Sequence, residues 1–557
     1  MSETESPSTS SGPLEDLRAQ LLASATDLGW PGQDDGVAAR ITLERPRRAQ
    51  FGDYSTNAAL LLAPALSAPA RELAERLGAA LATRLASALE RFEVAGPGFL
   101  NLFLSDEWLT AALAGVLAAG GGFGAGGADP PRRVLVEFVS ANPTGPMHVG
   151  HARNAAYGDA IARMLRFYGH QVEREFYVND AGTQVRKFGE SVGALARGEE
   201  PPADGYRGEY VGELAARLKY AVGADASSLG REAVAAMVEQ MRSALSAFGV
   251  EEFDIWTYES TLFEGDPSPV ERTLALLEQQ GHSYTHDGAL WLRTTAFGDD
   301  KDRPLIRSNG EHTYFASDIA YHQQKRERGF ERQIDVWGAD HHGYLARTKA
   351  AYEALGGDPA ELELLIMQLV HLMRGGERAQ MSKRSGEFVS LDDLVAEIGV
   401  DAARWYLLAR SHDTTVDLDL DLASEQSNEN PVYYVQYAHA RIASILERAG
   451  EARVQAALTA VGQEPLPPLH PSERALIELL LAWPAELAEA VQRRAPHRIA
   501  AYALELAQGY TAFYRDCRVL GAEPEAVESL RIALSLATRT ALARCLALLG
   551  VSAPERM

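Results

Sequence analysis

The chain carries the sequence VLVEFVSANPTGPMHVGHARNAAYGDAIARMLRFYGHQVEREFYV at residues 134–178, and this stretch decides the fold. Its first six residues form an apolar run broken only by Glu137, which is typical of a strand buried on both faces. Apolar residues then recur at helical spacing over 150–168, and Gly169 stands where a C-terminal cap belongs. Residues 171–178 again have strand character. This strand–helix–strand order predicts a βαβ unit with parallel strands.

The composition limits the class of protein. The 557 residues carry a formal net charge of −24, which argues against nonspecific binding of nucleic acid, and the 46% hydrophobic fraction excludes global disorder. The two cysteines, Cys517 and Cys545, can form neither a disulfide scaffold nor a four-thiolate zinc site. We therefore expect a reduced, cytoplasmic protein. The sequence shows no signal-peptide pattern and no apolar run that predicts a membrane span.

Charge and lysine are unevenly distributed along the chain. Residues 431–557 contain 13 Arg, no Lys and 13 acidic residues, so residues 1–430 carry the whole negative charge. The chain has only six lysines among its 53 basic residues. Because arginine is used where a simple surface cation would suffice, a retained lysine indicates a special role.

Periodicity and composition divide the chain into units. Residues 1–12 predict a disordered tail, and 119–130 predict a flexible Gly-rich linker. A small α+β domain is expected at 13–118, and an α/β domain at 131–430 with an irregular insertion at about 190–300. Further elements expected in these units are helices at 70–89, 345–355 and 362–373, and strands at 99–104 and 334–337.

Strand signals stop after Asn430. Four amphipathic patterns predict an all-α helical bundle over 431–557. The expected helices cover 432–448, 471–494, 497–514 and 525–549.

The turn after the first strand ends in PTGPMHVGH at residues 143–151. A helix N-terminus exposes unpaired N–H groups and the positive end of the helix dipole, so this turn predicts a phosphate site. His148 and His151 could donate hydrogen bonds to phosphate oxygens, and Gly150 would let a ligand approach the backbone closely. Metal ligation and chance are the alternatives for the histidine pair, although a zinc site needs further ligands.

A second chemical element is QMSKRSG at residues 380–386. It is a polar, Gly-flanked loop whose Lys383 lies 232 residues after His151. A lysine on such a loop could place its charge on a departing pyrophosphate. A solvated basic loop is the alternative interpretation, and the histidine pair upstream favours the chemical one.

These two elements resemble the HIGH and KMSKS signatures of class I aminoacyl-tRNA synthetases. Gln380 stands where that family has its first signature lysine, and Lys383 keeps the second. The phrase VEFVSANPTGPMHVGH at 136–151 is similar to arginyl-tRNA synthetases in particular. The similarity runs from about residue 14 to the end of the chain. Shorter phrases that share it are NDAG at 179–182, YFASDIA at 314–320, WGADHHG at 337–343 and NPVYYVQY at 430–437.

The resemblance implies a Rossmann-like parallel-sheet catalytic domain that forms arginyl-adenylate from ATP and L-arginine. Arginine would then pass to the 3′-terminal ribose of tRNA(Arg) in protein synthesis. Mg²⁺ would arrive with ATP, held largely by phosphate oxygens and water, so no protein metal site is expected. The implied catalytic residues are His148, His151 and Lys383. The implied ATP-binding residues are Pro143, Thr144, Gly145, His148, Gly150, His151, Gly338, Asp340, Met381, Ser382 and Lys383. The implied arginine-binding residues are Glu137, Ser140, Asn142, Tyr314, Asp318 and His342.

The chemistry of arginine agrees with this assignment. A guanidinium has five donors and no acceptor, so its pocket must supply carboxylates. Glu137 interrupts a strand that is otherwise apolar, and a carboxylate there is costly unless a cation pairs with it. Tyr314 and Asp318 are four residues apart, so on a helix they would share one face. The segment at 340–342 could instead be a turn that only caps the next helix.

The resemblance also implies two contacts with tRNA and a monomeric enzyme. The C-terminal bundle would read the anticodon, with Tyr433 and Tyr437 as stacking residues. The N-terminal domain would touch the tRNA corner through Arg45, Arg47 and Arg48. Core packing of the tyrosines and mere solvation of the arginine run are the alternatives.

Other classes fit the sequence less well. A class I synthetase for glutamate would need cations in the pocket, and one for cysteine would need zinc ligands. A non-catalytic RNA-binding paralogue has no reason to keep the two histidines and the loop lysine together. A nucleotidyltransferase of the same superfamily does not need a helical C-terminal domain.

Overall fold

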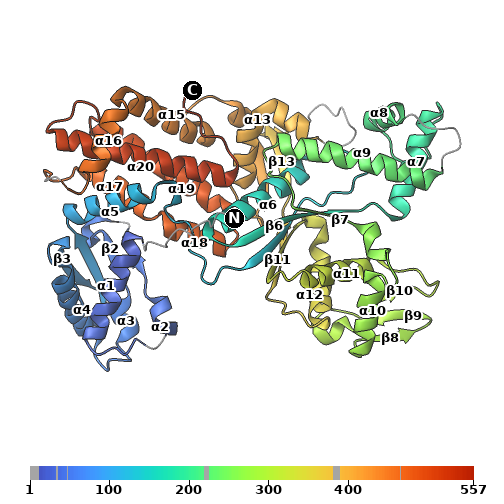
Figure 1. Cartoon of the computed structure of the whole chain (residues 1–557), viewed down its shortest axis with the longest axis horizontal. Helices are drawn as coiled ribbons and strands as arrows, with labels where there is room; N and C mark the ends of the chain where they lie inside the picture. Colours follow the sequence, from blue (N-terminus) through green and yellow to red (C-terminus); the bar gives the residue numbers. More distant parts are fainter. Residues whose placement is uncertain (1–11, 33–34, 47, 219–224, 380–388, 464–465) are drawn as a thin grey trace, which may run out of the picture.

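The computed structural model describes residues 12–32, 35–46, 48–218, 225–379, 389–463 and 466–557. Figure 1 shows an elongated molecule with a parallel sheet in the middle, an N-terminal unit and a helical bundle towards one end, and a second small unit at the other. The predicted tail at 1–12 falls outside the described residues except for Gly12.

The central sheet has five parallel strands in the order β12 (Leu362–Met367), β11 (Arg332–Gly338), β5 (Arg133–Glu137), β6 (Gln171–Val178) and β7 (Ile255–Tyr258). The predicted βαβ unit is therefore confirmed. Successive strands are added on opposite sides of β5, so the strand order reverses between β5 and β11. In open α/β sheets, ligands bind outside the carboxyl ends of the strands at such a point.

The helix that follows β5 is α6 (Val149–Tyr168), whose middle is buried. Gly158 lies against the strand end, because a Cβ added there would come within 2.2 Å of the Phe138 ring. The helix ends at Gly169 with φ of 112°, which is the left-handed cap that the sequence predicts. These contacts fix the direction of α6 and so place its N-terminus over the strand-order reversal.

The N-terminal unit is an α+β fold, as predicted. Its antiparallel sheet has the order β1 (Leu43–Glu44), β2 (Tyr54–Thr56), β4 (Phe99–Leu104) and β3 (Leu89–Ala95). Helices α1 (Pro13–Asp27), α3 (Ala58–Leu62) and α4 (Ala70–Leu85) pack with it around a separate apolar core that runs from Leu17 to Leu104.

The second small unit carries one wall of the later site. It contains α10 (Pro269–Gln279), the antiparallel strands β8 (Ser283–His286), β9 (Ala289–Leu292) and β10 (Arg303–Ile306), and α11 (Tyr314–Glu327). A third apolar cluster holds these elements to α12 (Leu345–Ala354).

The C-terminal part is all helical in its described residues after 430, as predicted. Its helices are α15 (Pro431–Ala449), α16 (Glu451–Ala460), α17 (Pro471–Leu481), α18 (Trp483–Gln492), α19 (Pro496–Asp516) and α20 (Glu525–Leu549). The helix predicted at 471–494 is two helices, because Pro484 occupies the first turn of α18.

Helix α20 is long and apolar enough to cross a membrane by length and composition alone, and no other described helix meets this test. The sequence expectation of no such segment was therefore too simple. In the structure 61% of its most apolar window is buried, so packing within the bundle accounts for its composition.

Three expectations for the linker and the central domain are wrong. The segment predicted as a helix at 362–373 forms strands β12 and β13 (Val370–Arg374). The insertion expected at 190–300 supplies a strand of the central sheet, β7, and the long helix α9 (Ala226–Ala247). The linker expected to be flexible is packed, because Arg544 Nε donates to Gly121 O at 2.9 Å and Trp483 Nε1 donates to Phe123 O at 2.9 Å.

The central domain and the bundle share one apolar core, which runs from Leu109 to Val551. A buried polar contact joins them as well. Arg404 of α13 (Leu391–Leu408) donates from Nε to Leu549 O at the end of α20, at 2.9 Å, and from Nη2 to Asp159 of α6, at 2.6 Å. Helix α6 is thus bound directly to the bundle.

Candidate active site

The turn between β5 and α6 is held in an unusual backbone conformation. Val139 and Ser140 have φ of 68° and 39°, values that residues with a side chain rarely adopt. Ser140 Oγ donates to Glu137 Oε1 at 2.8 Å and accepts from Tyr177 N–H at 3.1 Å. These bonds tie the turn to two neighbouring strands and set where the following residues lie.

The histidine pair stands at the N-terminus of α6. The two rings stack, with centroids 3.7 Å apart. Gly150 N–H donates to His148 Nδ1 at 3.1 Å, and His148 N–H donates to His151 Nδ1 at 3.3 Å. Since each Nδ1 accepts a hydrogen bond, each neutral ring carries its proton on Nε2. Gly150 has a second role here, because a Cβ would come within 2.9 Å of the His148 ring.

Burial keeps this pair neutral. It lowers the pKa of His148, an effect opposed by the nearby Asp340 carboxylate, and it lowers the pKa of His151 to about 3 with a further contribution from His148. The pair therefore offers N–H donors without positive charge.

One further segment of the chain meets this turn. Val149 N–H donates to Val389 O at 3.2 Å, and Leu391 N–H donates to Met147 O at 2.9 Å. The chain six residues after Lys383 therefore lies against the histidine turn. Met381, Ser382 and Lys383 themselves lie outside the described residues.

The other predicted nucleotide residues surround the strand-order reversal. Pro143, Thr144 and Gly145 lie in the turn after β5, where Thr144 O accepts from Tyr210 Oη at 2.9 Å. Gly338 ends β11, and Asp340 lies in the following 3₁₀ turn η6 (Ala339–Tyr344). A Cβ at Gly338 would come within 2.6 Å of Asp340 Oδ1, so a larger residue there would have to displace the Asp340 carboxylate.

We call the two carboxylates Asp318 and Glu259 the acidic pocket. Asp318 of α11 and Glu259 of η4 (Glu259–Phe263) interact electrostatically, and neither forms an ion pair with a Lys or Arg among the described residues. Burial raises the pKa of Asp318 to about 6. Burial, and after it the repulsion from Asp318, raises the pKa of Glu259 to about 7. Two such carboxylates without a cation form a site for one.

Sequence reasoning missed Glu259, which lies in the segment interpreted as an insertion. It accepts from Ser317 Oγ at 3.4 Å, and from the Asn179 amide at 2.7 Å when the amide nitrogen faces it. A signal was present: the run IWTY at 255–258 has strand character, and an acidic residue directly follows it.

Glu137 has a different environment from the one expected of a free arginine ligand. Its Oε2 accepts from Lys325 Nζ at 2.5 Å, and Lys325 also pairs with Asp335 at 2.8 Å. Lys325 thus supplies the cation that a buried Glu137 requires. The predicted direct contact of Glu137 with arginine has no support in this geometry, although Glu137 accepts a hydrogen bond from Ser140.

The remaining predicted arginine residues lie around the pocket. Tyr314 and Asp318 share α11, as their spacing predicts, and Tyr314 is 58% exposed. Asn142 is exposed in the turn after β5. His342 is exposed and contacts no charged or aromatic group in the described part of the chain. Its neighbour His341 lies closer to the pocket, because it interacts electrostatically with Asp318, and its ring lies tilted against that of Trp337 with centroids 5.7 Å apart.

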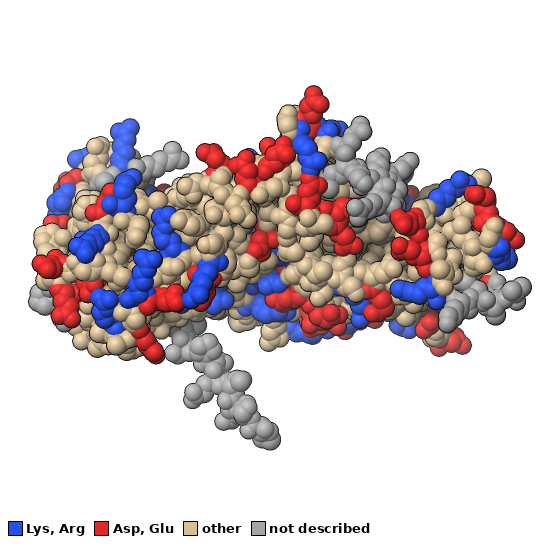
Figure 2. Space-filling model, turned by 90° about the horizontal axis from the view of Figure 1, so that it is seen from above, with Lys and Arg blue, Asp and Glu red and all other residues tan. Residues whose placement is uncertain are grey.

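The predicted RNA-contacting residues have mixed environments. Tyr433 and Tyr437 stack at 6.0 Å, and the Arg441 guanidinium lies 4.7 Å from the Tyr437 ring and 5.6 Å from the ring of half-exposed Tyr514. These four residues form what we call the aromatic ladder, on α15 and α19. Figure 2 shows basic and acidic side chains interspersed over the bundle half at left.

The arginine run in the N-terminal unit is not a free basic surface. Arg45 pairs with Glu478 of the bundle at 2.8 Å, which makes it a contact between units. Arg48 is exposed, and Arg47 lies outside the described residues.

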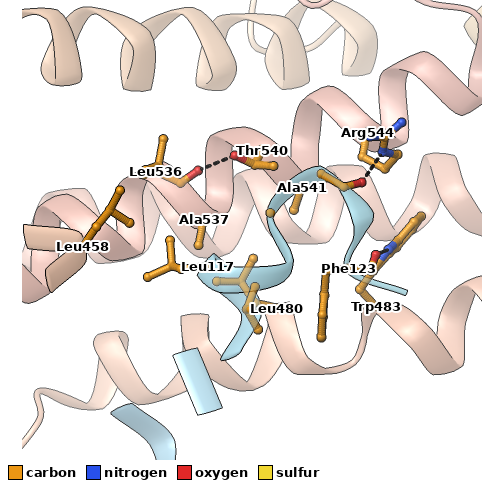
Figure 3. A pocket seen from close by; sticks show the side chains of 13 residues that line it. Leu117, Phe123, Leu458, Leu480, Trp483, Leu536, Ala537, Thr540, Ala541 and Arg544 are labelled. Atoms are coloured by element: carbon orange, nitrogen blue, oxygen red, sulfur yellow. Dashed lines mark hydrogen bonds between the residues drawn. The ribbon is translucent and has the colours of Figure 1, made fainter. Parts of the chain in front are cut away.

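An apolar cavity of about 170 Å³ lies away from this site, between the linker and the bundle. Figure 3 shows Phe123, Leu480 and Trp483 beside it, with α20 on the opposite side. Its lining is mostly apolar and contains no carboxylate, so it does not suit a cationic ligand.

The raised pKa values predict a pH dependence. Because both carboxyls titrate above their ordinary range, they bind protons more tightly in the folded, ligand-free protein than in the unfolded chain. Their contribution to folding stability is therefore greatest at low pH and is lost as pH rises through about 6 to 7. A cationic ligand needs both ionised, so its kcat/KM should fall about tenfold from pH 7 to pH 6 and more steeply below about 6, where both carboxyls take up protons.

Steady-state kinetics at pH 5.5 to 8.5 would measure this fall in kcat/KM. The KM for the nucleotide serves as the control, because burial lowers the pKa of both histidines and keeps that of His151 well below this window. A flat profile for the cationic substrate would contradict the assignment of the pocket.

Three family models match consecutive parts of the chain. They describe an arginyl-tRNA synthetase N-terminal domain at 15–104, the catalytic domain of class I (R) tRNA synthetases at 116–199 and 240–443, and a DALR anticodon-binding domain at 435–557.

Curated relatives and a solved structure agree with these matches. Proteins named arginine–tRNA ligase from Desulforudis audaxviator and Moorella thermoacetica are 46% and 44% identical over 97% and 98% of this chain, and over 97% and 100% of their own length. The structure of Thermus thermophilus arginyl-tRNA synthetase superposes with a TM-score of 0.75 at 26% identity, covering 97% of this chain and 99% of its own.

Proposed function

Since this chain belongs to the arginyl-tRNA synthetase family, we propose that ATP and arginine lie across the reversal between β5 and β11, with arginine in the acidic pocket. The protein is an arginine–tRNA ligase: it activates L-arginine with ATP and transfers it to the 3′-terminal ribose of tRNA(Arg). The observation that supports this placement best is the pair Asp318 and Glu259, two carboxylates of raised pKa that form no ion pair with a Lys or Arg in the described part of the chain.

In the activation step, the arginine carboxylate attacks the α-phosphorus of ATP in line. Catalysis is then positioning and stabilisation of developing charge. His148 and His151 donate from Nε2 to phosphate oxygens, and Lys383 lies on the loop that would meet the departing pyrophosphate. We assign the turn at 143–145, Gly338 and Asp340 to the nucleotide.

On the amino-acid side, Asp318 and Glu259 hold the guanidinium and Tyr314 covers it. Ser140 and Asn142 orient the α-amino and carboxylate groups. Either His341 or His342 extends the pocket rim, and the position of His341 favours it. Glu137 acts through Ser140.

Mg²⁺ supplies charge neutralisation on the phosphates when ATP brings it. Within the described residues, no group of three or more His, Cys, Asp or Glu side chains could hold a metal ion. The ion would therefore be bound by ATP oxygens and water, as hard cations with few protein ligands are.

We assign the domains at 13–118 and 431–557 to tRNA. The packed linker joins the first of them to the catalytic domain at 131–430, and the second follows that domain directly. We further propose a monomer in the cytoplasm. The buried free thiols of Cys517 and Cys545 suit a reducing compartment.

The test is aminoacylation and pyrophosphate exchange with each of the twenty amino acids in the presence of bulk tRNA. Arginine alone should be charged. Charging of another amino acid at a comparable kcat/KM would refute the assigned pocket.

The aromatic ladder predicts a separate effect on tRNA. Tyr437→Ala should raise the KM for tRNA about tenfold, since stacking of a base on an aromatic ring contributes about 1–3 kcal/mol. Arginine-dependent activation at saturating tRNA should not change.

A matched control is Tyr434→Phe on the same helix, which removes only the bond from Tyr434 Oη to Thr511 Oγ1 inside the bundle. Equal effects of the two variants on the KM for tRNA would assign the tyrosines to packing.

A further inference from the structure

Lys325 is one of the six lysines of the chain, and its side chain is fully buried. It lies on α11, two turns after Asp318, and points into the protein between β5 and β11. Its ammonium stands 4.4 Å from the Tyr321 ring centroid. A buried lysine is costly unless its charge is fully paired, so its position indicates a role that a surface cation does not have.

The partners of Lys325 lead to both walls of the site. On one side, Glu137 pairs with Lys325 through Oε2 at 2.5 Å and accepts from Ser140 Oγ through Oε1 at 2.8 Å. The ammonium is therefore linked through a single carboxylate to the strained turn that leads to the histidine pair.

On the other side, Asp335 accepts from Lys325 through Oδ1 at 2.8 Å, and its Oδ2 lies 2.9 Å from His322 Nε2. His322 Nδ1 lies 2.7 Å from the backbone carbonyl of Asp318. Asp335 is thus joined both to Lys325 and, through the His322 ring, to the turn of α11 that carries Asp318.

We propose that Lys325 is a positioning residue for arginine: it holds Glu137 and Asp335, and so fixes Ser140 and α11 in register while leaving Asp318 and Glu259 to the substrate. The inference rests on the proposed function. Without the ammonium, an ionised Glu137 would be a buried anion with no cation, so the turn would have to move to bring it to water. This movement would displace Ser140 from the α-amino group of arginine.

A cycle of Lys325→Met, Glu137→Gln and the double variant tests this. Lys325→Met should lower kcat/KM for arginine about 100-fold, mainly through KM, with the KM for ATP changed less than about twofold. The double variant should recover about tenfold over Lys325→Met, because a neutral glutamine needs no cation and its amide oxygen still accepts from Ser140.

Lys349→Met is the control, since Lys349 is an exposed lysine of the neighbouring helix α12. The proposal would be overturned if the double variant lost kcat/KM for arginine by the product of the two single losses. An unchanged arginine KM in folded Lys325→Met would overturn it as well. So would failure of both Lys325→Met and the double variant to fold, which would assign Lys325 to stability alone. Absence of arginine-dependent exchange in the unaltered protein would instead refute the proposed function.

Discussion

Asp318→Asn should lower kcat/KM for arginine by roughly 30- to 3,000-fold. Truncating one partner of a buried charge pair costs about 2–5 kcal/mol, much of it from the charge left unpaired. Here that charge is the guanidinium, which would keep only Glu259. The loss should be largest in the KM for arginine, measured by pyrophosphate exchange with tRNA present. The protein itself should become slightly more stable at neutral pH, because one buried carboxylate no longer has to ionise.

Asp287→Asn is the matched control. It removes one carboxylate from the hairpin between β8 and β9, where the side chain is 89% exposed. Its φ of 48° suits asparagine as well as aspartate, so the backbone should not change. An arginine KM that is equal in the two variants would exclude Asp318 from the pocket.

His151→Asn should lower kcat about 10²- to 10³-fold, and His151→Gln clearly less. Removal of one hydrogen-bond donor from a developing charge has an effect of this size. The comparison tests the tautomer. The glutamine amide nitrogen reaches about as far as Nε2, whereas the asparagine amide nitrogen lies near the position of Nδ1. Only glutamine can replace a donor at Nε2.

The KM for arginine should stay nearly constant in both histidine variants, because neither touches the acidic pocket. Single-turnover formation of arginyl-adenylate measures the step directly. Equal activity of the two variants, or a better asparagine variant, would contradict the assignment of Nε2 as the donor.

The chemistry of the nucleotide side was predictable because it is local in sequence. The strand, the turn, His148, His151 and the capping Gly169 follow one another within a single βαβ unit. The physics of a helix N-terminus is the same wherever it occurs, so position in the unit was enough. The strand boundaries at 171–178 and the last helix at 525–549 were predicted to the residue.

The amino-acid side depends on contacts that no spacing reveals. Glu137 and Lys325 are 188 residues apart, so the sequence showed that Glu137 needs a cation but not which one. The scarcity of lysine was the only hint. Glu259 was missed for the same reason, since β7 was not recognised as a strand of the sheet. The segment at 362–373 has Leu and Met at helical spacing, but pairing of β12 with β11 outweighs that propensity.

The apolar core shared by the sheet and the bundle limits how the protein can be divided. A fragment that ends near residue 430 would expose the face of α6 that packs on α20 and leave Arg404 without Leu549 as its acceptor. The helical bundle at 431–557 can therefore not be removed without exposing this core. A chimaera that takes the bundle from a relative would also need that relative's residues on the faces of α6 and α13 that contact the bundle. The N-terminal unit, which has its own core, is the segment that shuffling or truncation can separate from the rest.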